Sequence, residues 1–370
     1  MQSVVIHPSQ TPVTRVARHI RRLIARNHKP GDILPRQNEL AAELRVSMRT
    51  VSAAVHLLSR QGVVMAVPHR GTRVCRRITL DEMALSQVAL VSRFNIGRMF
   101  ESYIGQITMG FCRRLDEIES RISIFPSHRT GMTPMAEVRS SGVEATALLG
   151  VFDPDYLRPW IKQDLPVVVM DHCDRTIPLD YVVCDNLGAM RAVLGHLHAL
   201  GHRRVEYFAQ SVTAEASDSD RRERHEAFTV VCRELGMRHE RPYWEPRDFT
   251  VAGSPGVFDA FIRLLSLPEG RVTAVVTEAG ETAIVLIDAL AARGVRVPEK
   301  VSVAAAAQHP PLRDPSESTH ITCALMDFPG IGHRAVNILI ERMQSPAPQK
   351  ANIVRVGFTL QVGNTTSAPK

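Results

Sequence analysis

The chain has no stretch that would lead it to or across a membrane. Nowhere do about 18 apolar residues follow one another, and Met1–Gln10 has neither a basic start nor an apolar centre. A membrane-spanning helix needs a long apolar run, and a secretory signal needs a basic start followed by an apolar centre. We therefore expect a cytoplasmic protein without a signal peptide or a membrane anchor.

Motifs that hold metals or cofactors are also missing. The six cysteines form no C-x-x-C pair, and the 15 histidines show no H-E-x-x-H pair. His196 and His198 are two residues apart and would point in different directions on a helix. No G-x-S-x-G motif or phosphate-binding glycine loop occurs. We expect reduced cysteines and no metal, cofactor or catalytic residue.

The basic charge is gathered at one end of the chain. Residues 1–77 hold 14 Lys and Arg against 3 Asp and Glu, a net charge of +11. The whole chain carries +7, so the remaining residues sum to −4. Such a cluster of cations suits the neutralisation of DNA phosphates, although it could also form an ordinary solvated surface.

Residues 35–62 predict two short helices joined by a tight turn. The first helix is expected over residues 37–44 and the second over residues 48–60, with the turn at residues 45–46. The second helix has one apolar face, because its apolar residues recur at helical spacing: Val51, Ala54, Val55 and Leu58. This pattern is typical of a helix-turn-helix, whose second helix enters the DNA major groove; a plain helical hairpin is the alternative.

The flanking segments extend this pattern to a winged helix over residues 13–77. A helix with a buried stripe of Val16, Ile20 and Ile24 precedes it, and a strand–turn–strand with residues 69–71 at its tip follows. The segment resembles the DNA-binding domain of the GntR family of bacterial regulators. The matching residues are Lys29-Pro30-Gly31-Asp32, Leu34-Pro35, Glu39-Leu40-Ala41, Val46-Ser47, Thr50-Val51, Gly62 and Arg70-Gly71-Thr72.

The resemblance implies which side chains meet DNA. The expected contacts are Arg36, Asn38, Ser47, Met48, Arg49, Thr50, Ser52, Arg70 and Gly71. Arg49 can make two hydrogen bonds to guanine, whereas Ser47 and Thr50 would hold phosphates. Any one of these residues could instead be a plain surface group. Asn38, Met48 and Ser52 stand where family members often carry arginine, which leaves the operator sequence open.

Beyond a linker at residues 78–88, apolar strands alternate with helices. Strands are expected over residues 86–92, 122–125, 145–151, 165–170, 181–184, 205–209, 273–277 and 301–306, with an extended tail over 353–361. Helices are expected over residues 104–115, 154–163, 187–200, 221–235, 258–265, 281–293 and 332–343. This alternation predicts an α/β fold with parallel sheets.

Residues 89–365 resemble the sensor of LacI-family regulators, which is related to the periplasmic sugar-binding proteins. The matching residues are Leu165–Asp171, Asp185-Asn186, Gly188, His196-Leu197, Gly201–Val205, Arg224, Ala227-Phe228 and Gly294–Val303. The resemblance implies two lobes, one of about residues 89–209 with 328–346 and one of 210–322 with the C-terminal tail. A ligand would lie between them, at the carboxyl ends of the strands.

The resemblance also implies an effector site. The candidate residues are Phe94, Asn95, Arg98, Arg224, Glu278, Gln308, Asp327 and Phe328. Arg224 matches the arginine that faces the ligand in the family, and Phe328 could stack on a ligand ring; a surface ion pair and a core residue are the alternatives. Ala279-Gly280 and Ala307-Gln308 stand where family members often carry carboxylates that grip sugar hydroxyls. A sugar is thus one candidate effector.

These observations predict a DNA-binding transcriptional regulator, most simply a homodimeric repressor controlled by a small molecule. The alternative is a winged helix fused to a pyridoxal-phosphate aminotransferase-like domain, which would need a Schiff-base lysine. Beyond residue 77 the lysines are Lys162, Lys300, Lys350 and Lys370, and none lies in a recognisable cofactor context.

Overall fold

The computed structural model describes residues 12–68, 70–78, 85, 87–128, 131–163, 165–209, 219–239, 272–308, 319–344 and 351–370. Several expectations fall outside these residues: His69 at the wing tip, most of the linker, and the helix over 258–265. None of the helices within them is both long and apolar enough to span a bilayer.

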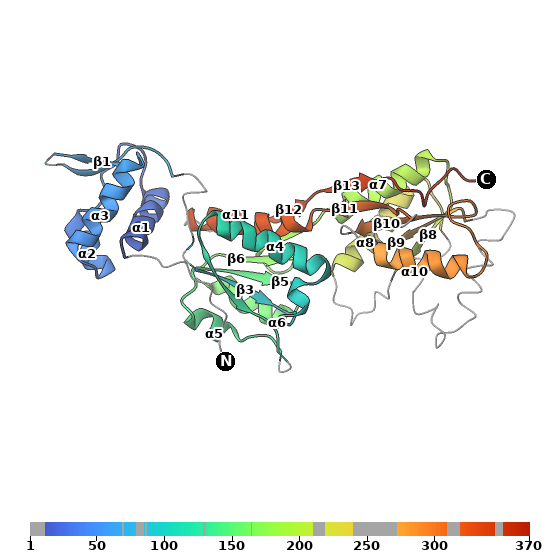
Figure 1. Cartoon of the computed structure of the whole chain (residues 1–370), viewed down its shortest axis with the longest axis horizontal. Helices are drawn as coiled ribbons and strands as arrows, with labels where there is room; N and C mark the ends of the chain where they lie inside the picture. The colour runs from blue at the N-terminus through green and yellow to red at the C-terminus, as the bar shows by residue number, and fades with distance from the viewer. Residues whose placement is uncertain are drawn as a thin grey trace. The chain divides into compact units, whose positions relative to one another are not determined.

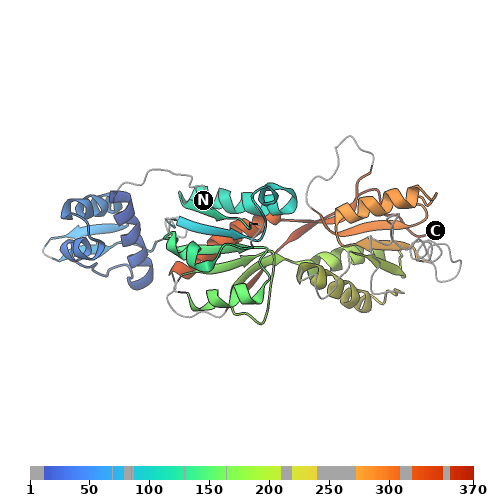
Figure 2. The same ribbon diagram turned by 90° about the horizontal axis from the view of Figure 1, so that it is seen from below.

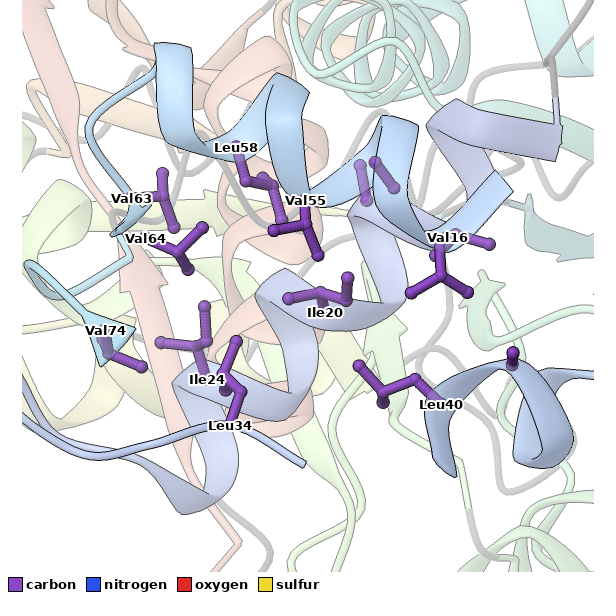
Figure 3. Packing of buried hydrophobic residues seen from close by; sticks show 14 residues of the cluster. Val16, Ile20, Ile24, Leu34, Leu40, Val55, Leu58, Val63, Val64 and Val74 are labelled. Atoms are coloured by element: carbon purple, nitrogen blue, oxygen red, sulfur yellow. The ribbon is translucent and has the colours of Figure 1, made fainter. Parts of the chain in front are cut away.

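The N-terminal part is a winged helix-turn-helix. Its elements are α1 (Pro12–Asn27), α2 (Gln37–Leu44), α3 (Met48–Arg60), β1 (Val64–Val67) and β2 (Gly71–Val74). The two strands pair antiparallel, with Val67 opposite Gly71. Figure 3 shows the shared core, which consists of Val16, Ala17, Ile20, Ile24, Leu34, Leu40, Ala41, Val51, Ala54, Val55, Leu58, Val63, Val64 and Val74. Each buried Val, Leu or Ile contributes about 1.5–3 kcal/mol to folding, so the predicted apolar stripes hold this domain together.

Local backbone signals fix both ends of α3. Arg45 adopts a left-handed conformation with φ 52°, which ends α2 and lets the Val46 N–H donate to the Ala41 carbonyl at 3.1 Å. Ser47 then caps α3, because its Oγ accepts a hydrogen bond from the Thr50 N–H at 3.2 Å. Gly62 has φ 68° and terminates the segment beyond α3. The predicted helix over residues 48–60 is confirmed.

The contacts within the chain define two compact units. The first comprises Met1–Met170, Arg175–Val182 and Pro329–Ile353; the second comprises Asp171–Asp174, Val183–Phe328 and Val354–Lys370. Both units are built on a largely parallel sheet, as the strand–helix alternation predicts.

The sheet of the first unit has the strand order β12-β7-β6-β5-β3-β4. Its strands are β3 (Gln87–Ser92), β4 (Arg121–Phe125), β5 (Ala145–Leu149), β6 (Val167–Met170), β7 (Asp180–Cys184) and β12 (Ile353–Val356). The last residues of β7 and β12 already belong to the second unit. The helices are α4 (Ser102–Glu117), α5 (Met135–Ser140), α6 (Pro154–Leu157) and α11 (Phe328–Gln344), and Figure 1 labels them around the sheet.

The sheet of the second unit has the order β13-β11-β10-β9-β8. Its strands are β8 (Val205–Phe208), β9 (Ala274–Thr277), β10 (Ser302–Gln308), β11 (Thr322–Met326) and β13 (Phe358–Gln361), and its helices are α7 (Asn186–Ala199), α8 (Ser219–Glu234) and α10 (Gly280–Ala291). Figure 2 shows α10 on one face of this sheet and α8 on the other. Leu286 and Leu290 of α10 pack on Val303 of β10 in the buried core.

The structure differs from the expected elements at several places, and the short helix α5 is one element that was not expected. The helix expected over 154–163 is α6 followed by a 3-10 helix, Arg158–Lys162, because Pro159 has no N–H for an α-helical hydrogen bond. The strand at 205–208 belongs to the sheet of the second unit, whereas the expectation put residues up to 209 in the first lobe. Strand β11 was not among the predicted elements.

The C-terminal residues close the second unit. The Val303 N–H donates to the Thr365 carbonyl at 2.8 Å, and the Thr322 N–H donates to Thr365 Oγ1 at 3.0 Å. Thr365 is 2% exposed. Further along, the Ser367 N–H donates to Ser302 Oγ, and the Ser367 carbonyl accepts from Ser302 Oγ and bonds the His202 ring. Residues 363–367 are therefore fastened to the first residues of β10 and β11.

Candidate DNA-binding surface and ligand-binding residues

Helix α3 presents a polar outer face opposite its buried stripe. Arg49, Ser52 and Met48 are exposed, and Met48 has 50% of its surface accessible. Within the described residues the Arg49 guanidinium has no hydrogen-bond or ion-pair partner, so its donors are available. A guanidinium on the first turn of such a helix has the geometry to bond both acceptors on the major-groove edge of guanine.

Ser47 and Thr50 are engaged with each other. Their hydroxyl oxygens lie 2.8 Å apart, in addition to the capping bond from the Thr50 N–H. These hydroxyls were expected to hold phosphates. In the structure these hydroxyls cap α3 and fix its first turn. They thereby set the direction in which Met48 and Arg49 point.

The wing and the start of α2 contribute further exposed residues. Arg70 and Gly71 lie at the turn between β1 and β2 and are exposed, as are Arg36 and Asn38 at the start of α2. The Arg36 N–H donates to Glu39 Oε2 at 2.8 Å, which ties the beginning of α2. These placements agree with a basic surface that continues from α3 to the wing.

Two exposed residues of α3 were missing from the predicted set. His56 and Arg60 are both exposed and follow Arg49 by seven and eleven residues, which is close to two and three helical turns. They therefore lie on the same outer face as Arg49. The helical period counted from Arg49 would have found them.

Phe94, Asn95 and Arg98 lie together at the carboxyl end of β3 in the first unit. The Phe94 N–H donates to Ser92 Oγ at 3.0 Å, and Asn95 Oδ1 accepts from the Arg98 N–H at 3.0 Å. Asn95 and Arg98 are exposed, whereas Phe94 is half-buried. A neighbouring residue was not foreseen: the Arg93 guanidinium lies 3.9 Å from the centroid of the Phe152 ring, a cation–π contact.

Arg224 lies in a buried hydrogen-bond chain of the second unit. It is 8% exposed on α8, donates from Nε to Asn186 Oδ1 at 3.0 Å, and donates from Nη1 to the Glu278 carbonyl at 3.4 Å. Asn186 in turn donates to Glu223 Oε2 at 3.0 Å, and Glu223 Oε1 accepts from Arg355 at 2.8 Å. The guanidinium is therefore held in one orientation, and it is buried rather than on the helix surface.

The other candidates of the second unit follow its strands. Glu278 comes directly after β9 and is buried, and Gln308 is the last residue of β10. Asp327 follows β11, is exposed, and donates its N–H to the Gly357 carbonyl at 3.3 Å. Phe328 begins α11 and is 4% exposed, so its side chain is part of the buried interior. Glu278 meets Arg224 directly, because its carbonyl accepts the hydrogen bond from Arg224 Nη1. The carboxyl ends of parallel strands, which Glu278 and Asp327 follow, are the usual place for a ligand in such folds.

His202, Cys232 and Cys323 have structural surroundings. Among the described residues, no three His, Cys, Asp or Glu side chains are arranged to hold a metal ion. His202 bonds Thr273 Oγ1 at 2.7 Å and the Ser367 carbonyl at 2.9 Å, and its burial lowers its pKa. Burial raises the pKa of Cys232 and of Cys323 to about 12, which leaves both thiols protonated and unreactive.

Comparisons with known proteins agree with this division of the chain. Residues 12–74 match the gntR family of bacterial regulatory proteins, and residues 194–366 match the periplasmic binding protein-like domain. The HTH-type transcriptional regulator Rv3575c of Mycobacterium tuberculosis is 25% identical over 360 residues, which cover 89% of this chain and 96% of that protein.

Solved structures share the fold of the C-terminal part. A LacI family transcriptional regulator from Mycobacterium smegmatis has a TM-score of 0.58 at 18% identity, covering 76% of this chain and 100% of that one. The complex of the transcriptional regulator CelR with cellobiose has a TM-score of 0.57 at 19% identity, covering 90% and 100%.

The two resemblances seen in the sequence are confirmed by these matches, and so is the non-enzymatic class. The chain is a DNA-binding transcriptional regulator, in which a gntR-family helix-turn-helix domain precedes a periplasmic binding protein-like domain.

Proposed function

We propose that this regulator is a cytoplasmic repressor that binds operator DNA as a homodimer and responds to a small-molecule effector. The observation that carries the DNA part is the outer face of α3, where the exposed Arg49 is unengaged within the described residues. A dimer would present two such helices to half-sites about one helical turn apart.

Selection of duplexes from a random library by the full chain tests the DNA part. The expected product is a site with two related halves, bound less tightly as salt rises because the +11 of residues 1–77 displaces counterions. Arg49→Ala should weaken binding to that site by about 10- to 100-fold, the range for one lost bidentate base contact. Arg139→Ala, an exposed arginine on α5, is the matched control and should bind like the wild type. Equal binding of every sequence would contradict the proposal.

The effector part is supported by the position of Arg224. A buried guanidinium, oriented by Asn186 and the Glu278 carbonyl at the carboxyl edge of the second sheet, suits hydroxyl or carboxylate oxygens of a small ligand. The CelR relative was solved with cellobiose, so sugars are the first class to test. Ala279 and Ala307 supply no carboxylates here, which favours a ligand that needs few acceptors.

Calorimetric titration with mono- and disaccharides, cellobiose among them, tests the effector part. A binding sugar should release heat with the wild type and none with Arg224→Ala. Arg191→Ala is the control, because Arg191 is an exposed arginine of the same unit that pairs with Glu234. The effector should also change operator affinity, which requires that it binds two states unequally. A panel that gives no heat at all would rule out a sugar.

The sign of regulation needs a transcription assay. A promoter that carries the selected site should be transcribed less when the protein is added and more when the effector follows. Stimulation by the protein alone would show an activator and contradict the repressor proposal.

A further inference from the structure

Met48 is an exposed apolar side chain at the start of the recognition helix. It is the first residue of α3, follows the capping Ser47, and keeps 50% of its surface accessible. Arg49 beside it and Ser52 one turn later are exposed as well. An apolar side chain at this position cannot contribute to a solvated basic surface, so its chemistry points to a particular contact.

The base edges in the major groove offer one apolar group. Thymine presents its C5-methyl group there, whereas guanine, adenine and cytosine present hydrogen-bond donors and acceptors. A thioether is flexible and polarisable and makes at most weak hydrogen bonds, so it packs well on a methyl group. Against guanine or cytosine it would remove water from polar groups without replacing the lost hydrogen bonds, which is unfavourable.

We propose that Met48 contacts the C5-methyl group of a thymine in each operator half-site and selects thymine there. The proposal rests on the proposed function, since it assigns a base to a DNA contact of the same domain. The occupant is DNA rather than another protein because Met48 lies beside Arg49 on a domain with a large positive charge.

Replacing thymines by deoxyuridine tests this contact, because uracil differs from thymine only by the missing methyl group. In the duplex selected by the full chain, each thymine is replaced in turn and the dissociation constant is measured. At one position of each half-site, uracil should weaken binding about three- to fivefold, the value of one buried methyl group. Met48→Ala should abolish this sensitivity at that position and leave the effects of all other substitutions unchanged.

Two further variants separate recognition from stability. Met48→Leu keeps an apolar side chain and should keep the preference for thymine, whereas Met48→Arg should shift the preference at the same position towards guanine. Met109→Ala is the matched control, since Met109 is an exposed methionine of α4 with 44% accessibility; it should keep the full uracil effect. Thermal melting confirms that each variant is folded.

The inference is overturned if Met48→Ala retains every uracil effect, or if no thymine of the site is sensitive to uracil while sequence-specific binding is intact. Absence of any selected sequence is a different result, because it would refute the proposed function and this inference together.

Discussion

The backbone of α4 at Gly110 lies directly against the backbone of α11 at Gly332. A Cβ atom on Gly332 would lie 2.1 Å from the carbonyl oxygen of Ile107 and 3.0 Å from the carbonyl carbon of Gly110. A Cβ atom on Gly110 would lie 2.0 Å from the carbonyl oxygen of Pro329. The two helices can approach this closely only because neither residue has a side chain.

Alanine at either glycine should therefore destabilise the first unit. We expect Gly110→Ala or Gly332→Ala to lower the free energy of unfolding by about 1–3 kcal/mol or more, because backbone atoms cannot move aside as a flexible side chain would. Urea denaturation followed by circular dichroism measures this. Gly195→Ala in α7 is the control: nothing lies within 4 Å of its added Cβ, so helix propensity should make it neutral or stabilising. An equal change in the free energy of unfolding for all three variants would contradict the close approach of α4 and α11.

Arg45 and Gly62, which have left-handed backbone conformations on either side of α3, should change the stability of the winged helix in opposite directions when they are substituted. Arg45 bears the cost of a side chain at φ 52°, so Arg45→Gly should stabilise the winged helix by up to about 1 kcal/mol. Gly62 has φ 68° with nothing near its Cβ position, so Gly62→Ala should destabilise it by about 1 kcal/mol through the backbone alone. Hydrogen exchange of the amides in α2 and α3 of the full chain reports both. If both variants changed the protection of these amides in the same direction, the left-handed conformations of Arg45 and Gly62 would be contradicted.

An ion pair joins Arg342 of α11 to Asp180 of β7 in the first unit. Arg342 donates from two nitrogens to Asp180, which is 6% exposed and also accepts the Asn352 N–H at 2.9 Å. The hydrogen bond to Asp180 raises the pKa of Arg342. Arg342→Ala leaves a buried carboxylate without its cation and should cost about 3–5 kcal/mol.

A double variant isolates that effect. Asp180→Asn combined with Arg342→Met removes both charges and keeps an acceptor for Asn352, so it should be more stable than Arg342→Ala alone. The urea midpoints of the wild type, the single variants and the double variant form the measurement. A double variant that is no more stable than the single one would argue against an unpaired charge as the cause.

His202 predicts that the second unit loses stability in mild acid. Burial lowers its pKa below the ordinary value of 6.5, so the unfolded chain binds a proton at a higher pH than the folded chain does. Stability should be constant above about pH 6.5 and fall below it as the unfolded state gains the proton. His202→Gln can keep bonds to Thr273 and Ser367 without titrating and should flatten the curve. Urea midpoints between pH 8 and pH 5 measure this, and an unchanged slope in the variant would refute it.

The helix-turn-helix could be predicted closely because its signals are local. Ser47, Gly62 and the spacing of Val51 and Leu58 lie within 16 residues and define both the ends and the buried face of α3. The strand at 205–208 was also visible as an apolar run. Which sheet it joins depends on β9, about 70 residues later, and no local pattern carries that information.

The candidate effector residues show the same limit. Arg224 was found from a family match, but the bond from Arg355 to Glu223 joins residues 132 positions apart. In the sequence, Asn186 is only part of a matching motif; its role in orienting Arg224 depends on the packing of α7 against α8. Such contacts follow from tertiary structure, which neither composition nor helical spacing determines.

The late position of β12 in the chain has a consequence for biosynthesis. This strand covers the edge of β7, yet about 170 residues separate the two. On the ribosome, the neighbouring strands emerge well before Ile353–Val356, so β7 presents unpaired backbone groups while residues 185–352 are still being translated. Nascent chains stalled before Ile353 should therefore bind chaperones or aggregate, whereas release of the finished polypeptide should end that exposure.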